Sequence, residues 1–264
     1  MHRVLSLLFL ICCWLQLSVQ QARVNTTEPP NYVPRPRIVG GVAARPGQFP
    51  YLVSVRFFER HICTGSILNP QFVVTAAHCI YRVPVSLLSI HAGITRLSAS
   101  GDGEKSQVAK VIMHPSFKTV CRGSFDVALL RLPRNLTFSS EINSIPLAIN
   151  DPPVNSDVTI AGWGATSHRG PVSNELLFTN VTLLSRQYCV KHHYLRLSAT
   201  IMCLYHNANV GACHGDSGGP AVYNGELVGI ASWVLNLCGL SEPDGYERVS
   251  EVREWIIGLI KTNR

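Results

Sequence analysis

The sequence GACHGDSGGP, residues 211–220, places an acid, Asp216, directly beside a possible nucleophile, Ser217. The glycines around them leave the serine hydroxyl open to a substrate. A carboxylate next to a nucleophilic oxygen should hinder its attack, so Asp216 needs a purpose of its own. The rest of the chain has to supply that purpose and a base for Ser217.

The letters GDSGG also fit G-x-S-x-G, the strand-to-helix turn that carries the nucleophile in α/β-hydrolases. In that fold the acid and the histidine of the triad follow the serine along the chain. Here the last histidine, His214, precedes Ser217. The chain order therefore excludes the α/β-hydrolase fold, and the base must come from upstream.

Two apolar runs upstream provide candidates for the base and for an acid that orients it. VVTAAHC (73–79) ends in His78 and Cys79, and FDVALLRL (125–132) contains Asp126 at its start. A buried carboxylate needs a partner that accepts its charge, and beside an imidazole it fixes the tautomer that takes the serine proton. Simpler interpretations remain open: His78 as a hydrogen-bonded core residue and Asp126 as a strand-end cap.

Short apolar runs separated by Gly, Pro, Asn and Ser clusters indicate an all-β sandwich or barrel. The runs occupy residues 51–55, 72–76, 127–132, 157–163 and 226–233. Helical spacing occurs only in SEVREWIIGLIK (250–261), where an apolar stripe follows a Ser250 cap. The stripe consists of Val252, Trp255, Ile256 and Leu259.

Length and charge narrow the class of protein. A chain of 264 residues, 46% of them apolar, can bury the core of one large domain or two small coupled ones. The net charge is +7, but residues 1–37 hold four of the 23 basic and one of the 16 acidic residues, which leaves +4 for the remainder. Without a basic run this is an ordinary solvated surface, and we expect no nucleic-acid partner.

The amino terminus is typical of an export signal. A basic start is followed by the apolar stretch VLSLLFLICCWLQL (4–17), which is shorter than the roughly 20 residues that a bilayer core requires. We predict a signal peptide over residues 1–20, with its end between Ser18 and Ala22, and a secreted, extracellular protein without a membrane anchor. The Pro-rich segment EPPNYVPRPR (28–37) is expected to form an extended, cleavable linker.

Seven cysteines remain of nine once Cys12 and Cys13 leave with the signal. In an oxidising compartment most of them should pair, but six cysteines allow fifteen connectivities, so spacing alone does not assign the partners. A metal site is not expected: there is no C-x-x-C or H-E-x-x-H, and His192 and His193 are adjacent, so they point to different faces of a helix or strand.

Four motifs follow one another along the chain: RIVGG (37–41), VVTAAHC, FDVALL and CHGDSGGP. From Ile38 to the last helix the chain resembles the chymotrypsin/trypsin family of serine proteases. The resemblance implies two six-stranded antiparallel β-barrels and a C-terminal α-helix. The protease domain would span 38–264, with barrel one over about 38–140, barrel two over about 141–249 and the helix over about 250–262.

The resemblance also implies a role for each motif residue. His78, Asp126 and Ser217 would form the catalytic triad, and the amides of Gly215 and Ser217 the oxyanion hole, without a cofactor. Residues 21–37 would be an activation pro-segment. A trypsin-like protease would cut after Arg37, and the new ammonium of Ile38 would pair with Asp216, which answers the opening question: Asp216 orders the oxyanion loop and takes no part in the chemistry.

Three disulfides follow from the same resemblance: Cys63–Cys79, Cys189–Cys203 and Cys213–Cys238. Cys121 is left over, either as a free thiol, which we favour, or as a tie to another chain. N-glycosylation sequons begin at Asn25, Asn135 and Asn180. Asn135 would lie at the exposed crossing between the barrels and is the sequon most expected to be occupied.

Substrate preference is the least determined property. The resemblance assigns the substrate pocket to Gly211, Ala212, His214, Ser232, Trp233, Val234 and Asp244. Trypsins carry an Asp where this chain has Gly211, and Val234 would narrow the entrance as in elastases. We therefore predict cleavage after small or medium apolar residues (Ala, Val, Leu), with cleavage after Arg or Lys through Asp244 as the alternative.

The expected partners are a polypeptide substrate, the activating protease and protein protease inhibitors, and the expected state is a monomer. A different class of function also stays open, a secreted binding protein that keeps this fold without catalysis. Such relatives usually lack a triad residue, whereas this chain keeps His78, Asp126 and Ser217.

Overall fold

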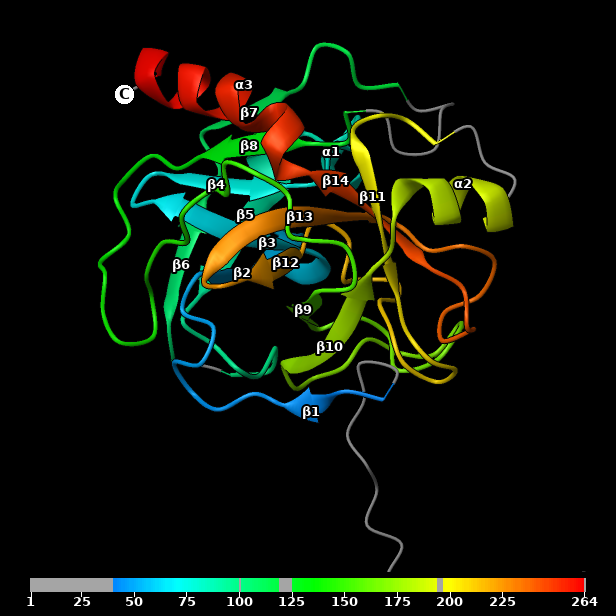
Figure 1. The fold of residues 1–264 in the computed structure, drawn as a ribbon. Helices are drawn as coiled ribbons and strands as arrows, with labels where there is room; N and C mark the ends of the chain where they lie inside the picture. Colours follow the sequence, from blue (N-terminus) through cyan, green and yellow to red (C-terminus); the bar gives the residue numbers. More distant parts are fainter. Residues whose placement is uncertain (1–39, 100, 119–124, 194–196, 264) are drawn as a thin grey trace, which may run out of the picture. The chain divides into compact units, whose positions relative to one another are not determined.

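The computed structural model describes residues 40–99, 101–118, 125–193 and 197–263. The predicted signal peptide and pro-segment, the cleavage site at Arg37 and Ile38, and Cys121 lie outside the described residues. The described part of the chain contains two β-sheets, a carboxy-terminal helix and three short helical segments (Figure 1).

The first sheet contains seven antiparallel strands in the order β6-β5-β2-β3-β4-β8-β7. Their bounds are β2 (Leu52–Phe57), β3 (Arg60–Asn69), β4 (Phe72–Thr75), β5 (Leu88–Ala92), β6 (Glu104–Gln107), β7 (Lys110–Met113) and β8 (Ala128–Arg131). Only Val108 and Ala109 separate the two edge strands β6 and β7, and their amides donate to Leu88 O (3.0 Å) and Arg131 O (2.9 Å). The chain therefore joins the two edges, and the sheet closes into a barrel of six strands if β6 and β7 are counted as one bent strand.

The second sheet closes through β9. Its strands are β1 (Val42–Ala43), β9 (Asp157–Gly162), β10 (Leu177–Leu183), β11 (Ile201–Tyr205), β12 (Pro220–Tyr223), β13 (Glu226–Trp233) and β14 (Asp244–Arg248). Because β9 pairs with both β12 and β10, the strands β9 to β14 form a ring of six. β1 adds to β10 as a seventh strand, through the pair Val42 and Phe178. The predicted all-β fold with two barrels is confirmed.

Three apolar clusters hold the barrels and fix how they meet. Strand residues such as Val53, Ile67 and Leu130 fill barrel one, and Val158, Met202 and Tyr246 fill barrel two. A third cluster joins side chains of both sheets to the helix: Phe72, Val74 and Leu129 from the first, Leu227 and Ile230 from the second, and Val249, Val252 and Ile256 from the helix. The cleft between the barrels is thus set by a shared core.

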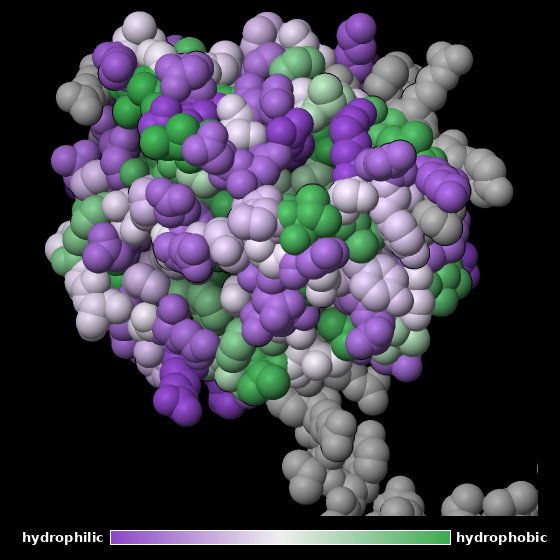
Figure 2. Space-filling model, in the orientation of Figure 1, coloured by the Kyte–Doolittle hydropathy of each residue, from purple (hydrophilic) through white to green (hydrophobic). Residues whose placement is uncertain are grey.

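On the surface, hydrophilic side chains cover most of the visible face (Figure 2).

The terminal helix α3 (Val249–Thr262) begins one residue before its predicted start. Its predicted cap is wrong. The N-cap position is Arg248, without a side-chain cap, and Ser250 instead donates its hydroxyl to Asp151 Oδ1 at 2.6 Å. The other end of α3 is tied to barrel one, where Arg131 Nε donates to Asn263 O at 2.9 Å.

Three short helical segments were not predicted: α1 (Ala77–Ile80), the 3-10 turn η1 (Val85–Leu87) and α2 (Arg186–His193). Of these, α1 matters most for function because it carries His78. Among the described residues, no helix is long and apolar enough to cross a membrane.

Candidate active site

His78 and Asp126 meet because their elements are paired. His78 lies in α1 directly after β4, Asp126 lies just before β8, and β4 pairs with β8 in the register Thr75 with Ala128. Asp126 Oδ2 is 2.6 Å from His78 Nδ1, and Asp126 Oδ1 accepts the backbone N–H of His78 at 2.8 Å. The carboxylate therefore holds the proton on Nδ1 and leaves Nε2 free to accept one.

Barrel two completes the surroundings of Asp126, which is only 3% exposed. Ser232 on β13 donates its hydroxyl to Asp126 Oδ2 at 2.6 Å. The backbone N–H of Asp126 donates to Glu247 Oε2 on β14 at 3.1 Å. Sequence reasoning placed Ser232 only in the substrate pocket and missed Glu247. Its neighbours in the last strand, DGYER, are mostly polar, so an acid at this position gave no signal.

Glu247 is fully buried, and burial raises the pKa of its carboxyl from 4.5 to about 8. Hydrogen bonds from Thr200 and from the amide of Asp126 lower the pKa, but they do not offset the loss of water. At neutral pH the folded protein therefore holds a proton that the unfolded chain would release.

Replacing Glu247 by glutamine is expected to stabilise the protein at pH 7, by on the order of 2 kcal/mol. Below about pH 4.5 the raised pKa of Glu247 makes its full contribution to the stability of the folded state. This contribution is lost as the pH rises toward 8. Glutamine keeps an acceptor for the amide of Asp126 and has no such dependence. Urea unfolding of both proteins at pH 7 and pH 4 measures the effect, which should vanish at pH 4. A variant less stable at pH 7 would contradict a protonated Glu247.

Ser217 and His78 line the same cleft, which has a volume of about 240 Å³. The serine is half-buried, and its carbonyl accepts the backbone N–H of Thr64 on β3 at 2.9 Å. Gly218 follows with a φ of +78°, and a Cβ there would lie 2.1 Å from Thr75 Oγ1. Glycine at 218 thus lets the nucleophile turn pack directly onto barrel one.

The loop before Ser217 leaves two backbone amides outside the internal hydrogen bonds. Gly215 has a φ of +100°, and its carbonyl is held inward by His61 Nε2 and Thr64 Oγ1, each at 3.1 Å. Among the hydrogen bonds of the described residues, none is donated by the amide of Gly215 or of Ser217. Both predicted oxyanion donors are therefore available to a substrate.

Asp216 points away from Ser217 into the protein. Its Oδ1 accepts the amide of Gly164 at 2.8 Å and its Oδ2 that of Cys213 at 2.9 Å. Burial raises the pKa of this carboxyl to about 7, against the lowering effect of these two amides. In the part of the chain that the structure describes, no basic group pairs with it.

Five of the seven predicted pocket residues line the cleft: Ala212, His214, Ser232, Trp233 and Val234. Cys213, Ala231, Gly245 and Tyr246 line it as well. Gly211 and Asp244 do not; Asp244 is buried behind the wall, where its Oδ2 accepts the amide of Ala212 at 2.9 Å. Beside it lies His206, which sequence reasoning missed.

Three disulfides have the partners that the family resemblance implied: Cys63–Cys79, Cys189–Cys203 and Cys213–Cys238. The first fixes α1 to β3 beside His78, and the third borders the cleft. Two groups of His and Cys side chains come close enough to hold a metal, Cys63 with His78 and Cys79, and His168 with His214 and Cys238. All their cysteines are in disulfides, which removes the thiolates that such a site would use.

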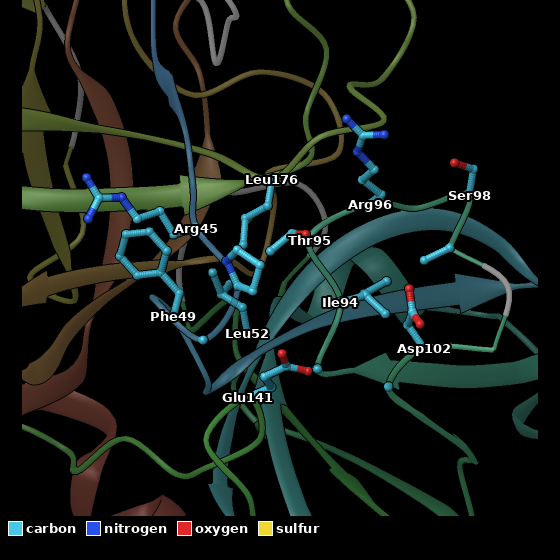
Figure 3. A pocket seen from close by; sticks show the side chains of 15 residues that line it. Arg45, Phe49, Leu52, Ile94, Thr95, Arg96, Ser98, Asp102, Glu141 and Leu176 are labelled. Atoms are coloured by element: carbon cyan, nitrogen blue, oxygen red, sulfur yellow. The ribbon is translucent and has the colours of Figure 1, made fainter.

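A second and larger cavity, of about 630 Å³, shares no lining residue with the catalytic cleft (Figure 3). Phe49, Leu52, Ile94 and Leu176 give it apolar walls, and Arg45, Arg96, Asp102 and Glu141 add charges. It contains no pair of nucleophile and base, so the chemistry belongs to the smaller cleft.

Comparisons with known proteins agree with this geometry. Residues 38–256 match the protein family described as Trypsin. A serine protease of Anopheles gambiae is 41% identical over 226 residues, covering 83% of this chain and 80% of that protein. Trypsin alpha-4 of Lucilia cuprina is 32% identical, covering 97% of this chain and 98% of its own length.

Solved structures show the same fold. Neuropsin, a serine protease from mouse brain, superposes with a TM-score of 0.77 at 28% identity, covering 83% of this chain and 98% of its own. Human heparin binding protein superposes with a TM-score of 0.76 at 29% identity, covering 85% and 97%. Because one of these is described by what it binds, the fold alone does not decide the activity, and the residues of the cleft carry the argument.

Proposed function

Because the chain belongs to the trypsin family of serine proteases and is a serine endopeptidase, we propose that it is secreted as an inactive precursor and, once activated, cleaves polypeptides after small or medium apolar residues. The observation that carries the proposal is that His78 and Ser217 line one cleft while the buried Asp126 contacts His78 Nδ1 from behind. The physiological partner is therefore a polypeptide, together with the protease that activates the precursor and protein inhibitors that occupy the cleft.

The proposed reaction proceeds through an acyl-enzyme. Ser217 Oγ attacks the carbonyl carbon of the scissile bond while His78 Nε2 takes the hydroxyl proton, and Asp126 stabilises the resulting imidazolium. The amides of Gly215 and Ser217 bind the oxyanion. His78 then gives its proton to the leaving amine as the C–N bond breaks. Water, deprotonated by His78, attacks the ester, and the proton returns to Ser217 as the acid product leaves.

The proposed activation rests on Asp216. Its carboxyl is buried with two backbone donors but without a cation among the described residues, and its pKa is raised to about 7 by burial. A buried carboxyl of this kind is stabilised by an ammonium partner. Cleavage between Arg37 and Ile38 would supply one, the new α-amine of Ile38.

The cleft walls support an apolar preference. Ala212, Ala231 and Val234 line it, and no Asp or Glu is among the lining residues that the structure describes. Burial raises the pKa of Asp244, which lies behind the wall. A substrate cation that enters this cleft loses water without meeting an exposed carboxylate, which disfavours Arg and Lys.

A peptide panel that varies only the residue before the scissile bond tests this preference. We expect kcat/KM for Ala, Val and Leu to exceed that for Arg by about tenfold or more, the usual scale of discrimination by a pocket of this kind. The assay uses the chain cut after Arg37, with trypsin as the control that prefers Arg. An Arg peptide cleaved tenfold better than the Val peptide, with that activity lost in Asp244→Gly, would overturn the assignment.

Export as the proposed route agrees with two features of the structure. Three disulfides join six of the cysteines, as expected in an oxidising compartment. Asn135 and Asn180 are both exposed, as attachment of a glycan requires, whereas Asn25 lies outside the described residues.

A further inference from the structure

A buried pair of ionisable side chains, His206 and Asp244, lies behind the substrate cleft. His206 follows β11 directly, and Asp244 opens β14, which pairs with β11 in the register Leu204 with Asp244. The side chains are 2% and 6% exposed, and His206 Nε2 is 3.2 Å from Asp244 Oδ2. The pairing of two strands thus brings an imidazole and a carboxylate together away from water.

The polar contacts of His206 and Asp244 indicate how many protons the pair holds. His206 Nδ1 is 3.1 Å from the carbonyl oxygen of Asn207, which can only accept, so Nδ1 carries a proton. Nε2 lies 3.2 Å from Oδ2 in a buried site. An unpaired buried carboxylate is costly, so this contact favours a second proton that is shared by the pair. Whichever atom holds it, the net charge of the pair is zero.

The pKa directions agree with a shared proton. Burial lowers the pKa of His206, but the hydrogen bond and the charge of Asp244 outweigh it and raise the pKa overall. Burial raises the pKa of Asp244 in spite of the lowering effects of His206 and of the Ala212 amide. Both groups therefore hold protons more strongly than they would in water.

The pair is directly behind the part of the cleft wall that Ala212 and Cys213 form. A Cβ on Gly211 would lie 2.3 Å from His206 Nε2, so the imidazole fills the space that a side chain at 211 would need. Asp244 Oδ2 also accepts the amide of Ala212, whose side chain lines the cleft. His206 thus occupies the space between Gly211 and Asp244 behind the wall and offsets the charge of Asp244.

We propose that His206 is a specificity-determining residue, which neutralises Asp244 and fills the space beside Gly211 so that the pocket rejects Arg and Lys. The inference rests on the proposed function, because it concerns the pocket of the same cleft. It explains how an acid can stand next to the substrate pocket without attracting basic residues. Without the imidazole, Asp244 would be an unpaired carboxylate beside an empty space that a guanidinium or ammonium group could fill.

The test replaces His206 by alanine in the chain cut after Arg37. We expect kcat/KM for Arg or Lys peptides, relative to the Val peptide, to rise at least tenfold over the wild-type ratio. Binding of benzamidine, a small amidinium cation, should tighten in parallel. The double variant His206→Ala/Asp244→Asn should lose both gains, since the carboxylate that attracts the cation is gone.

Two further variants separate the effect of losing the charge of His206 from the effect of a general loss of packing in the core. His206→Gln keeps a side chain of similar length without the cationic form, and should shift the ratio in the same direction by a smaller factor. His91→Ala removes another fully buried imidazole, whose Nε2 is 2.8 Å from Asp102 O in barrel one, and should leave the ratio unchanged. If His206→Ala does not fold, the Gln variant and benzamidine binding decide.

The possible failures are distinguishable. A wild-type protein that cleaves no peptide of the panel contradicts the proposed function. A wild-type protein that cleaves after apolar residues, with neither His206 variant gaining on Arg or Lys, overturns the role of His206 alone. A wild-type preference for Arg or Lys would show that Asp244 is not neutralised, and overturns both.

Discussion

Replacing Asp126 by asparagine is expected to lower kcat by about four orders of magnitude, the scale known for this change in a serine protease triad. The carboxylate accepts three donors: the amide of His78 at Oδ1, and His78 Nδ1 and the Ser232 hydroxyl at Oδ2. An amide offers only one acceptor oxygen. Since the backbone N–H of His78 cannot lose its proton, the asparagine oxygen should face it.

The asparagine NH₂ group then faces His78 Nδ1, which has to become the acceptor. The imidazole proton moves to Nε2, the atom that should take the proton of Ser217, and the base is held in the wrong tautomer. The geometry of the cleft would survive while the reaction stops. This separates a chemical role of Asp126 from a purely structural one.

The measurement is kcat and KM on the Val peptide, with thermal unfolding to confirm that the variant is folded. Asp157→Asn provides the matched control, because Asp157 lies exposed at the start of β9. It should retain wild-type activity. A folded Asp126→Asn protein within tenfold of the wild-type kcat would contradict the assigned role and favour the simpler interpretation of Asp126 as a strand-end cap.

The motifs predicted the chemistry of the cleft because the residues that make up each motif are consecutive in the sequence. GDSGG places the nucleophile next to its oxyanion donors, and the apolar runs before His78 and after Asp126 are the strands β4 and β8 that bring those residues together. Chain order excluded the competing hydrolase fold. The family resemblance supplied the barrel topology and the disulfide partners, which spacing had left open.

The missed residues are those whose roles arise only from strand pairing. Glu247 and His206 matter because β14 places Glu247 behind Asp126 and Asp244 beside His206, and neither contact has a local signal. The prediction of Ser250 as the helix cap was wrong for the same reason. Its hydroxyl donates a hydrogen bond to Asp151, which lies almost a hundred residues upstream. The helix α2 went unpredicted because Arg186–His193 has no clear apolar stripe.

A second large effect is expected at the activation site: Arg37→Gln should leave the secreted chain nearly inactive. The cut after Arg37 creates the α-amine that Asp216 lacks among the described residues, and without the cut Ile38 keeps a neutral amide. The matched control is Arg35→Gln. Arg35 is followed by Pro36, which makes it a poor cleavage site, so its loss should not prevent activation by trypsin.

Amino-terminal sequencing and labelling of Ser217 by a phosphonate probe measure the outcome. Wild type treated with trypsin should begin at Ile38 and be labelled, and Arg37→Gln should remain uncut and unlabelled. Full activity of Arg37→Gln would refute the switch. Failure to label the cut wild type, beside a labelled trypsin control, would instead support the silent binding protein.

The Asp216→Asn variant separates the cut after Arg37 from the ion pair that the cut is expected to create. The variant should be cut after Arg37 like the wild type but should be slower by about 10² to 10³ in kcat, the effect of losing an oxyanion donor. Asparagine carries no charge for the ammonium of Ile38, and its NH₂ group must face the amide of Gly164 or of Cys213, both of which donate to Asp216. The loop that presents the amide of Gly215 therefore loses its anchor.

The proposed pair of Ile38 and Asp216 is expected to set the alkaline limit of activity. A free α-amine titrates near pH 8, and a buried carboxylate partner raises its pKa in the folded protein. The contribution of the ion pair to the active conformation is therefore complete below about pH 8 and is lost as the pH rises through the raised pKa of the amine. A pH profile of kcat/KM for the cut protein should fall on that alkaline side, whereas Asp216→Asn, which has no pair to lose, should be low and flat there. A variant that followed the wild-type decline would show that another group causes it.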